Sequence, residues 1–231
     1  MINVDWVYII CSEKFEKERY NDWLVWLSIN NIKGSIEFYK WGTELSNEDV
    51  NQYVLRDGTL EKTFPWRTGY PIRDSEASVG INFLKIFEDA YNKNYEKILV
   101  LESDVILHPD FISITNDALQ SVDGQDFNCI SLGFGMGMRL TNDYDQVILG
   151  RVNQFRCADS LIFNRTAIDY FYNNLKQIRM PIDEEFTQAV KDNKIIIYWL
   201  DPPIAVQASQ LGQNSSSVQF GNPYNLEIPW L

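Results

Sequence analysis

The sequence predicts a single α/β domain in which helices cover a mostly parallel central sheet. Three observations favour this class. Apolar, strand-like runs alternate with segments of helical periodicity, and no internal repeat or linker divides the chain. A length of 231 residues with 45% hydrophobic content is also enough for one sizeable core. We therefore treat residues 1–231 as one domain, in which 207–231 form a loop-rich tail of Gly, Asn and Ser residues.

The chain begins with the expected β–α alternation. Val4–Ile10 is a buried type of strand, and apolar residues at three-and-four spacing from Phe15 predict an amphipathic helix. A second strand is expected over Ile36–Trp41. Ser46, followed by acidic residues, is typical of the N-cap of a short helix. Residues 58–70 then form a loop rich in Gly, Pro and aromatic residues.

A longer helix precedes the most informative strand of the chain. Apolar residues at helical spacing predict a helix that begins at Asp74 or Ser75. A turn leads from it into a run of apolar strand formers from Lys97, and this run places Glu102 and Asp104 at its C-terminal end. The carboxylates therefore follow a helix and end a strand.

The second half of the chain continues the alternation, with a glycine-spaced loop at Gly133–Arg139 that we expect to be a flexible turn. The remaining expected elements are a helix from Pro109 to Val122, strands at Asn128–Leu132 and Ser160–Phe163, a helix from Thr166 to Leu175, a helix from Pro181, and a strand at Lys194–Leu200.

Glu102 and Asp104 are the residues that indicate a function most directly. In an extended backbone, residues i and i+2 face the same side, so both carboxylates can face one ligand. Hard oxygen ligands at a strand end suit Mg²⁺ or Mn²⁺, and such a cation keeps open positions for phosphate oxygens. Ligands of parallel α/β sheets bind outside the carboxyl ends of the strands. This pattern therefore predicts a metal-assisted sugar-nucleotide site.

Composition excludes several other classes. The net charge of −12 argues against nucleic acid as a partner, because nucleic-acid-binding proteins present basic surfaces. The same acidity would repel an anionic donor unless a cation reverses the local charge. His108 is the only histidine, which excludes a histidine-rich zinc site. The N-terminus has no secretion signal and no run reaches transmembrane length, so we expect a cytoplasmic protein.

The order of several short motifs resembles glycosyltransferase family 25, the lipooligosaccharide and procollagen galactosyltransferase group. The resemblance extends from about Val4 to Ser217. The family's acidic motif is commonly Leu-Glu-Asp-Asp-Val, and Ser103 stands here in place of the middle acid. The motifs that carry the resemblance are Ser75–Phe83, Ile98–Val105, Pro181–Glu185, Pro203–Gln207 and Ser215–Ser217.

The resemblance implies a Rossmann-like GT-A fold and a metal-dependent, inverting hexosyltransferase. Glu102 and Asp104 would be its DXD-like motif and bind Mn²⁺ or Mg²⁺. The donor would be a UDP-hexose, by analogy UDP-galactose, and the acceptor a saccharide or a hydroxylated protein. The substrate-binding residues that the resemblance implies are Arg19, Glu76, Asn82, Asp159 and Gln207.

An inverting transfer needs a carboxylate that takes the proton of the acceptor hydroxyl, on the face opposite the leaving group. Asp183 is the first choice for this base, and Glu184 and Glu185 are the alternatives. The same three acids are also what a helix dipole favours in a first turn, so a capping role stays open for each of them.

Two other functions stay open. The chain can be a catalytically degenerate nucleotide-sugar or glycan-binding module, because Ser103 departs from the family pattern and Asn82-Phe83 stands where the family tends to carry Ser-His. It would then bind ligand without metal and without turnover. It can also be a metal-dependent phosphohydrolase, which would release phosphate without a sugar acceptor.

Overall fold

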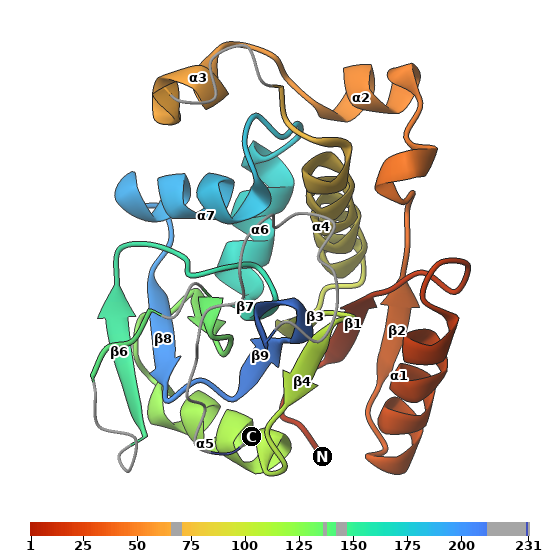
Figure 1. The fold of residues 1–231 in the computed structure, drawn as a ribbon. Helices are drawn as coiled ribbons and strands as arrows, with labels where there is room; N and C mark the ends of the chain where they lie inside the picture. The colour runs from red at the N-terminus through yellow and green to blue at the C-terminus, as the bar shows by residue number, and fades with distance from the viewer. Residues whose placement is uncertain (66–70, 136–137, 142–146, 212–229, 231) are drawn as a thin grey trace.

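The computed structural model describes residues 1–65, 71–135, 138–141, 147–211 and 230. In this part of the chain a seven-stranded sheet has the order β2-β1-β3-β7-β5-β8-β6, and a separate two-stranded sheet pairs β4 with β9 (Figure 1). The strands are β1 (Trp6–Ile10), β2 (Gly34–Glu37), β3 (Lys97–Glu102), β4 (Val105–Leu107), β5 (Cys129–Ser131), β6 (Ile148–Val152), β7 (Ser160–Asn164), β8 (Ile197–Asp201) and β9 (Ala205–Gln207).

Helices lie on both faces of the large sheet. Tyr8 and Ile10 of β1 belong to the core cluster beneath α4, α6 and α7, whereas Val7 and Ile9 belong to the cluster beneath α1 and α5. This alternation is the period of a strand buried on both faces. The helices are α1 (Lys17–Ile29), α2 (Asn47–Tyr53), α3 (Thr59–Thr63), α4 (Asp74–Asn92), α5 (Phe111–Ser121), α6 (Arg165–Asn174) and α7 (Ile182–Lys191), with 3₁₀ turns η1 (Gly42–Glu44) and η4 (Ala208–Leu211).

The predicted α/β class is confirmed, and the sheet is mixed. Strands β2 and β3 are parallel to β1, and β8 is parallel to β5. Strand β7 is antiparallel to both β3 and β5, and β6 is antiparallel to β8. Within the described residues, β2, β1, β3, β5 and β8 therefore run in one direction, while β7 and β6 run in the other. The sheet is mostly parallel in direction, but β7 separates its two parallel parts.

Several local features depart from the expected boundaries. The second strand is Gly34–Glu37 rather than Ile36–Trp41, and the backbone N–H of Tyr39 donates instead to the Asn82 side chain at 2.9 Å. Strands β4 and β6 were not predicted. The cap of α6 is Asn164 rather than Thr166, because Asn164 Oδ1 accepts from the N–H of Ala167 at 3.0 Å.

The start of the predicted loop-rich tail is ordered. Gln207 ends β9, and η4 follows it. The serine-rich motif at 215–217 lies outside the described residues. The expected cap at Ser46 is confirmed, since its hydroxyl accepts from the N–H of Asp49 in a capping box.

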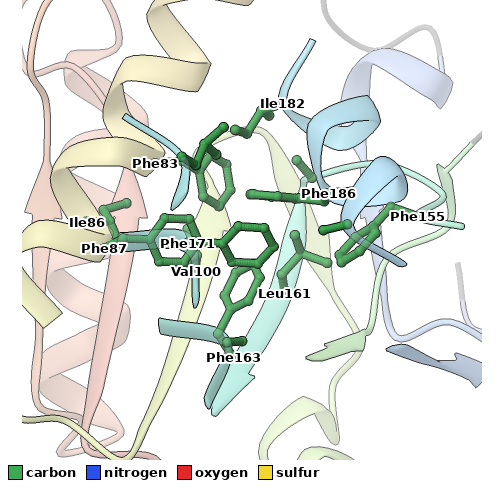
Figure 2. Packing of buried hydrophobic residues seen from close by; sticks show 14 of the residues in the cluster. Phe83, Ile86, Phe87, Val100, Phe155, Leu161, Phe163, Phe171, Ile182 and Phe186 are labelled. Carbon is green, nitrogen blue, oxygen red and sulfur yellow. The ribbon is translucent and has the colours of Figure 1, made fainter. Parts of the chain in front are cut away.

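Aromatic side chains fill the core between the sheet and the α4–α6–α7 layer. Figure 2 shows rings from α4, β7, α6 and α7 meeting in one group. The centroid of Phe186 lies 4.7 Å from that of Phe171 and 5.3 Å from that of Phe83. Edge-to-face and offset pairs of this kind stabilise a core beyond simple area burial. We call this group the phenylalanine cluster: Phe83, Phe87, Phe155, Phe163, Phe171 and Phe186.

No helix in the described ranges is long and apolar enough to cross a membrane. Cys11 and Cys129 are buried and unpaired, as small apolar side chains would be, whereas Cys157 is partly exposed.

Candidate functional site

Three acidic residues meet where β3 ends. Glu102 is the last residue of β3, and Asp104 lies in the turn that leads to β4. Strand β7 pairs with β3 in antiparallel fashion up to Leu101 and Ser160. The pairing continues one residue further, where the N–H of Glu102 donates to the carbonyl of Asp159 at 2.8 Å. The carboxyl end of β3, where the sequence predicted the site, therefore carries Asp159 as well as the two predicted metal ligands.

The segment after β8 supports both predicted metal ligands. Gln207 Nε2 donates to Glu102 Oε2 at 2.8 Å, and Ser209 Oγ donates to Asp104 Oδ2 at 3.3 Å. Gln210 Nε2 in turn donates to Gln207 Oε1 at 2.9 Å. Strand β9 brings these residues to the site because Gln207 pairs with Val105 of β4.

Sequence reasoning proposed Gln207 but missed Ser209 and Gln210. Residues 207 onward have the composition of a loop. Ser209 contacts Asp104, 105 positions away, and Gln210 reaches the site only through Gln207, whose partner Glu102 is equally distant. A periodicity reading detects only local order, so no local signal marked these two residues.

Like charges at this site raise one another's pKa. Burial, followed by the charges of Asp104 and Asp159, raises the pKa of Glu102 well above its usual value. The charge of Asp183 adds to this effect, and the hydrogen bond from Gln207 opposes it. Burial also raises the pKa of Asp104, and the nearby Arg19 lowers it in part. The charges of Asp104, Asp159 and Asp183 thus all act on Glu102, and we call these four residues the acidic cluster.

Asp159 is the most deeply buried member of the acidic cluster. Its side chain is fully buried, and among the described residues no N–H or O–H reaches either carboxylate oxygen with hydrogen-bond geometry, although the Cys157 thiol and the Ser160 backbone are near enough to lower its pKa in part. Burial raises its pKa to about 6. Gly133 leaves space for this carboxylate, since a Cβ atom there would lie 1.8 Å from Asp159 Oδ1. A buried carboxylate without a donor is costly unless another group compensates it.

These features fit a divalent cation. The donors are hard carboxylate oxygens, they repel one another, and the partly buried Glu102 and Asp104 remain accessible. Within the described ranges, no three His, Cys, Asp or Glu side chains are arranged to enclose an ion by themselves. Glu102 and Asp104 would thus supply only part of a coordination shell, which suits a cation completed by phosphate oxygens.

The three acids of α7 have different environments. Glu185 is buried and accepts from Arg179 Nη2 at 2.7 Å and from the N–H groups of Arg179 and Met180. These bonds make Glu185 a structural residue that holds the segment before α7. Asp183 is partly buried, accepts from the N–H of Glu184 at 3.1 Å, and has its pKa raised by burial to about 6. Burial also raises the pKa of the partly buried Glu184.

The two candidates on α4 are engaged in the fold. Glu76 Oε2 accepts from the N–H of Arg73 at 2.8 Å in a capping arrangement, and its charge contributes to the raised pKa of Asp183. Asn82 is buried and binds the N–H of Tyr39 and the carbonyl of Ser78. Glu76 therefore lies near the acidic cluster, whereas the bonds of Asn82 fix the chain after β2 to α4.

Arg19 is linked to the Glu102–Asp104 turn through Glu16. Its Nη1 atom pairs with Glu16 Oε1 at 2.5 Å, and its charge lowers the pKa of Asp104. Ser103 Oγ donates to both carboxylate oxygens of Glu16, each at 2.9 Å. Sequence reasoning proposed Arg19 but missed Glu16, which precedes α1 and resembles an ordinary exposed helix-start acid.

The glycine-spaced loop is more closely packed than a flexible turn would be, in the part that the structure describes. Gly133 forms a parallel bridge with Ala205. A Cβ atom at Gly135 would lie 2.3 Å from the carbonyl oxygen of Arg156. Arg139 pairs with the buried Asp201, which also accepts from the N–H of Leu140 at 2.7 Å. Residues 136–137 lie outside the described residues.

Comparisons with known proteins add little about function. No family model matches the chain, and no curated protein matches it. Among solved structures, the crystal structure of A197 from STIV is similar with a TM-score of 0.47 and 14% sequence identity. The match covers 84% of this chain and 80% of that chain. The similarity is too distant to carry a conclusion about activity.

Proposed function

We propose that this protein is a metal-dependent, inverting glycosyltransferase that moves a hexose from a UDP-sugar to a saccharide or a hydroxylated protein. The observation that carries the proposal is the acidic cluster at the carboxyl end of β3. Separate segments of the chain place Asp104, Asp159 and Asp183 where their charges act on Glu102, and burial together with these charges raises the pKa of Glu102. An arrangement that destabilises the fold in this way is more typical of a functional site than of a structural one.

Glu102 and Asp104 are the residues that would hold Mn²⁺ or Mg²⁺. When bound, the cation would neutralise the negative charge that develops on the leaving diphosphate. Gln207 and Ser209 orient the two carboxylates through the bonds to Glu102 and Asp104. Arg19, which pairs with Glu16 and whose side chain is 32% exposed, would bind the diphosphate through its guanidinium.

Asp183 is the base that the environment favours among the three acids of α7. With a pKa of about 6, it is ionised at neutral pH and still basic enough to accept the proton of an attacking hydroxyl. Glu185 is occupied by Arg179 and two backbone N–H groups. Galactose as the transferred sugar rests only on the resemblance of the sequence to family 25.

A nucleotide-sugar screen tests the proposal. Thermal unfolding and donor hydrolysis are measured for a panel of nucleotide sugars, with and without Mn²⁺, on the wild type, Asp104→Ala and Asp123→Ala. Asp123 is an exposed acid at the end of α5, so its substitution matches the change in charge away from the site. Ligand binding to the folded state raises its stability by mass action.

We expect one donor to raise the unfolding temperature of the wild type and of Asp123→Ala only when Mn²⁺ is present. Asp104→Ala should lose that gain together with the slow hydrolysis of the donor. Stabilisation of all three proteins to the same extent, with or without metal, would contradict the proposal.

One observation favours a second function, the binding of a nucleotide sugar without turnover. Ser103 replaces an acid of the family motif, and the described residues do not enclose an ion by themselves. This function predicts donor binding that Mn²⁺ does not change, so the same screen distinguishes the two.

A further inference from the structure

The contacts of Glu16 support an inference that rests on the proposed function and extends it. Glu16 lies just before α1, and only 12% of its side chain is exposed. It pairs with Arg19 Nη1 at 2.5 Å and accepts from Ser103 Oγ through both oxygens at 2.9 Å. One carboxylate thus joins the first turn of α1 to the turn between the two predicted metal ligands.

A second contact holds the same two segments together. Trp23 Nε1, from the middle of α1, donates to the carbonyl oxygen of Ser103 at 3.0 Å. Arg19 is therefore linked to the Glu102–Asp104 turn through Glu16, which binds both the guanidinium of Arg19 and the hydroxyl of Ser103.

We propose that Glu16 is a positioning residue that fixes Arg19 beside the Glu102–Asp104 turn, where the guanidinium binds the diphosphate of the donor. Ser103 is the residue that makes this arrangement possible, because its hydroxyl donates to a carboxylate that an acid at position 103 would repel. The carboxylate that this turn lacks, relative to the family motif, is thus supplied by the start of α1.

The proposal predicts the sign of a binding change. If Glu16 acted only through its charge, Glu16→Gln would remove repulsion and tighten the binding of anionic UDP. If Glu16 positions Arg19, the same substitution keeps an acceptor for Ser103 but removes the ion pair, and UDP binding weakens. A well-placed charge-assisted contact to a phosphate corresponds to about tenfold in affinity.

The experiment is calorimetric titration with UDP in saturating Mn²⁺, and separately with Mn²⁺ alone. We expect Glu16→Gln to weaken UDP binding about tenfold and to leave the affinity for Mn²⁺ alone within about twofold. Glu18→Gln is the matched control, since it removes the same charge from an exposed position in the same helical turn. It should bind UDP at least as tightly as the wild type.

Ser103→Ala is a second variant, which removes only the hydroxyl that donates to Glu16. It should weaken UDP binding in the same direction by about two- to threefold. In turnover assays both variants should raise KM for the donor more than they lower kcat.

Two results would overturn the proposal. If the Glu16→Gln variant binds UDP as tightly as the wild type, or more tightly, Glu16 does not position Arg19 for the diphosphate. A loss of Mn²⁺ binding as large as that of Asp104→Ala would make Glu16 a metal ligand instead. A wild type that binds no UDP in Mn²⁺ would overturn the proposed function itself, and this outcome is distinct from both.

Discussion

The phenylalanine cluster and the acidic cluster respond to burial in opposite ways. In the phenylalanine cluster, rings such as Phe171 and Phe186 lose contact with water and gain contacts with one another. In the acidic cluster, burial removes water from carboxylates such as Asp159 that gain no N–H or O–H donor in return.

The phenylalanine cluster contributes to stability, whereas the acidic cluster reduces stability and is expected to serve a function. Apolar burial is the main favourable contribution to folding, whereas uncompensated buried acids reduce stability. Buried acids that reduce stability are therefore typical of sites where a ligand or a reaction requires them. Substitutions in the two clusters should therefore have opposite effects on the free energy of unfolding, and this contrast can be tested.

The largest effect on stability is expected from Phe186→Ala. Phe186 is fully buried and packs against several rings of the phenylalanine cluster, so its removal leaves a cavity. We expect a loss of about 3–5 kcal/mol in the free energy of unfolding, measured by urea denaturation. Phe15→Ala is the control, since Phe15 is 45% exposed, and it should lose less than about 1 kcal/mol. Equal losses of unfolding free energy at the two positions would contradict a larger contribution of the phenylalanine cluster to stability.

The main effect of Asp183→Asn should be on turnover. If Asp183 is the base, kcat should fall by about 10²- to 10⁴-fold, while UDP binding stays close to that of the wild type. In the wild type, kcat/KM should rise with pH through about 6, where Asp183 loses its proton. Asp192→Asn, at the exposed C-terminal end of the same helix, is the control and should leave the rate unchanged. A decrease of less than tenfold for Asp183→Asn would assign the proton transfer to another group.

A smaller effect is expected in the pH dependence of stability. Burial raises the pKa of Asp183 from 3.8 to about 6, so between these values the folded state binds more protons than the unfolded state. The stability that depends on Asp183 is therefore present at low pH and is lost as the pH rises through about 6. We expect the Asp183→Asn variant to lack this loss, which amounts to about 1–2 kcal/mol after allowance for partial exposure. Parallel curves of unfolding free energy against pH for the two proteins would contradict this prediction.

The smallest effect on the free energy of unfolding is expected from a substitution of Ser103. Ser103→Asp restores the acid of the family motif but places it against Glu16, so we expect a loss of about 1 kcal/mol. Combined with Glu16→Gln, the loss should be smaller than the sum of the single losses. A double-mutant cycle in urea measures this coupling, and additive losses would show that the two side chains do not interact.

The sequence by itself determined the α/β class, the order of most elements and the position of Glu102 and Asp104. These features depend on local properties. Apolar runs, helical spacing and capping residues such as Ser46 act within one or two turns, and the i, i+2 relation places two carboxylates on one side of a strand.

Only the tertiary structure decided how the other residues join the site. Asp159, which the family resemblance named as substrate-binding, lies opposite Glu102 because β7 runs antiparallel to β3. Ser209, which the sequence did not indicate, lies beside Asp104 because β9 pairs with β4. The tertiary structure also distinguished Asp183 from Glu185, since the partner of Glu185 is Arg179. Strand pairing, burial and ion pairs depend on contacts between segments far apart in the chain, and residue spacing carries no information about these contacts.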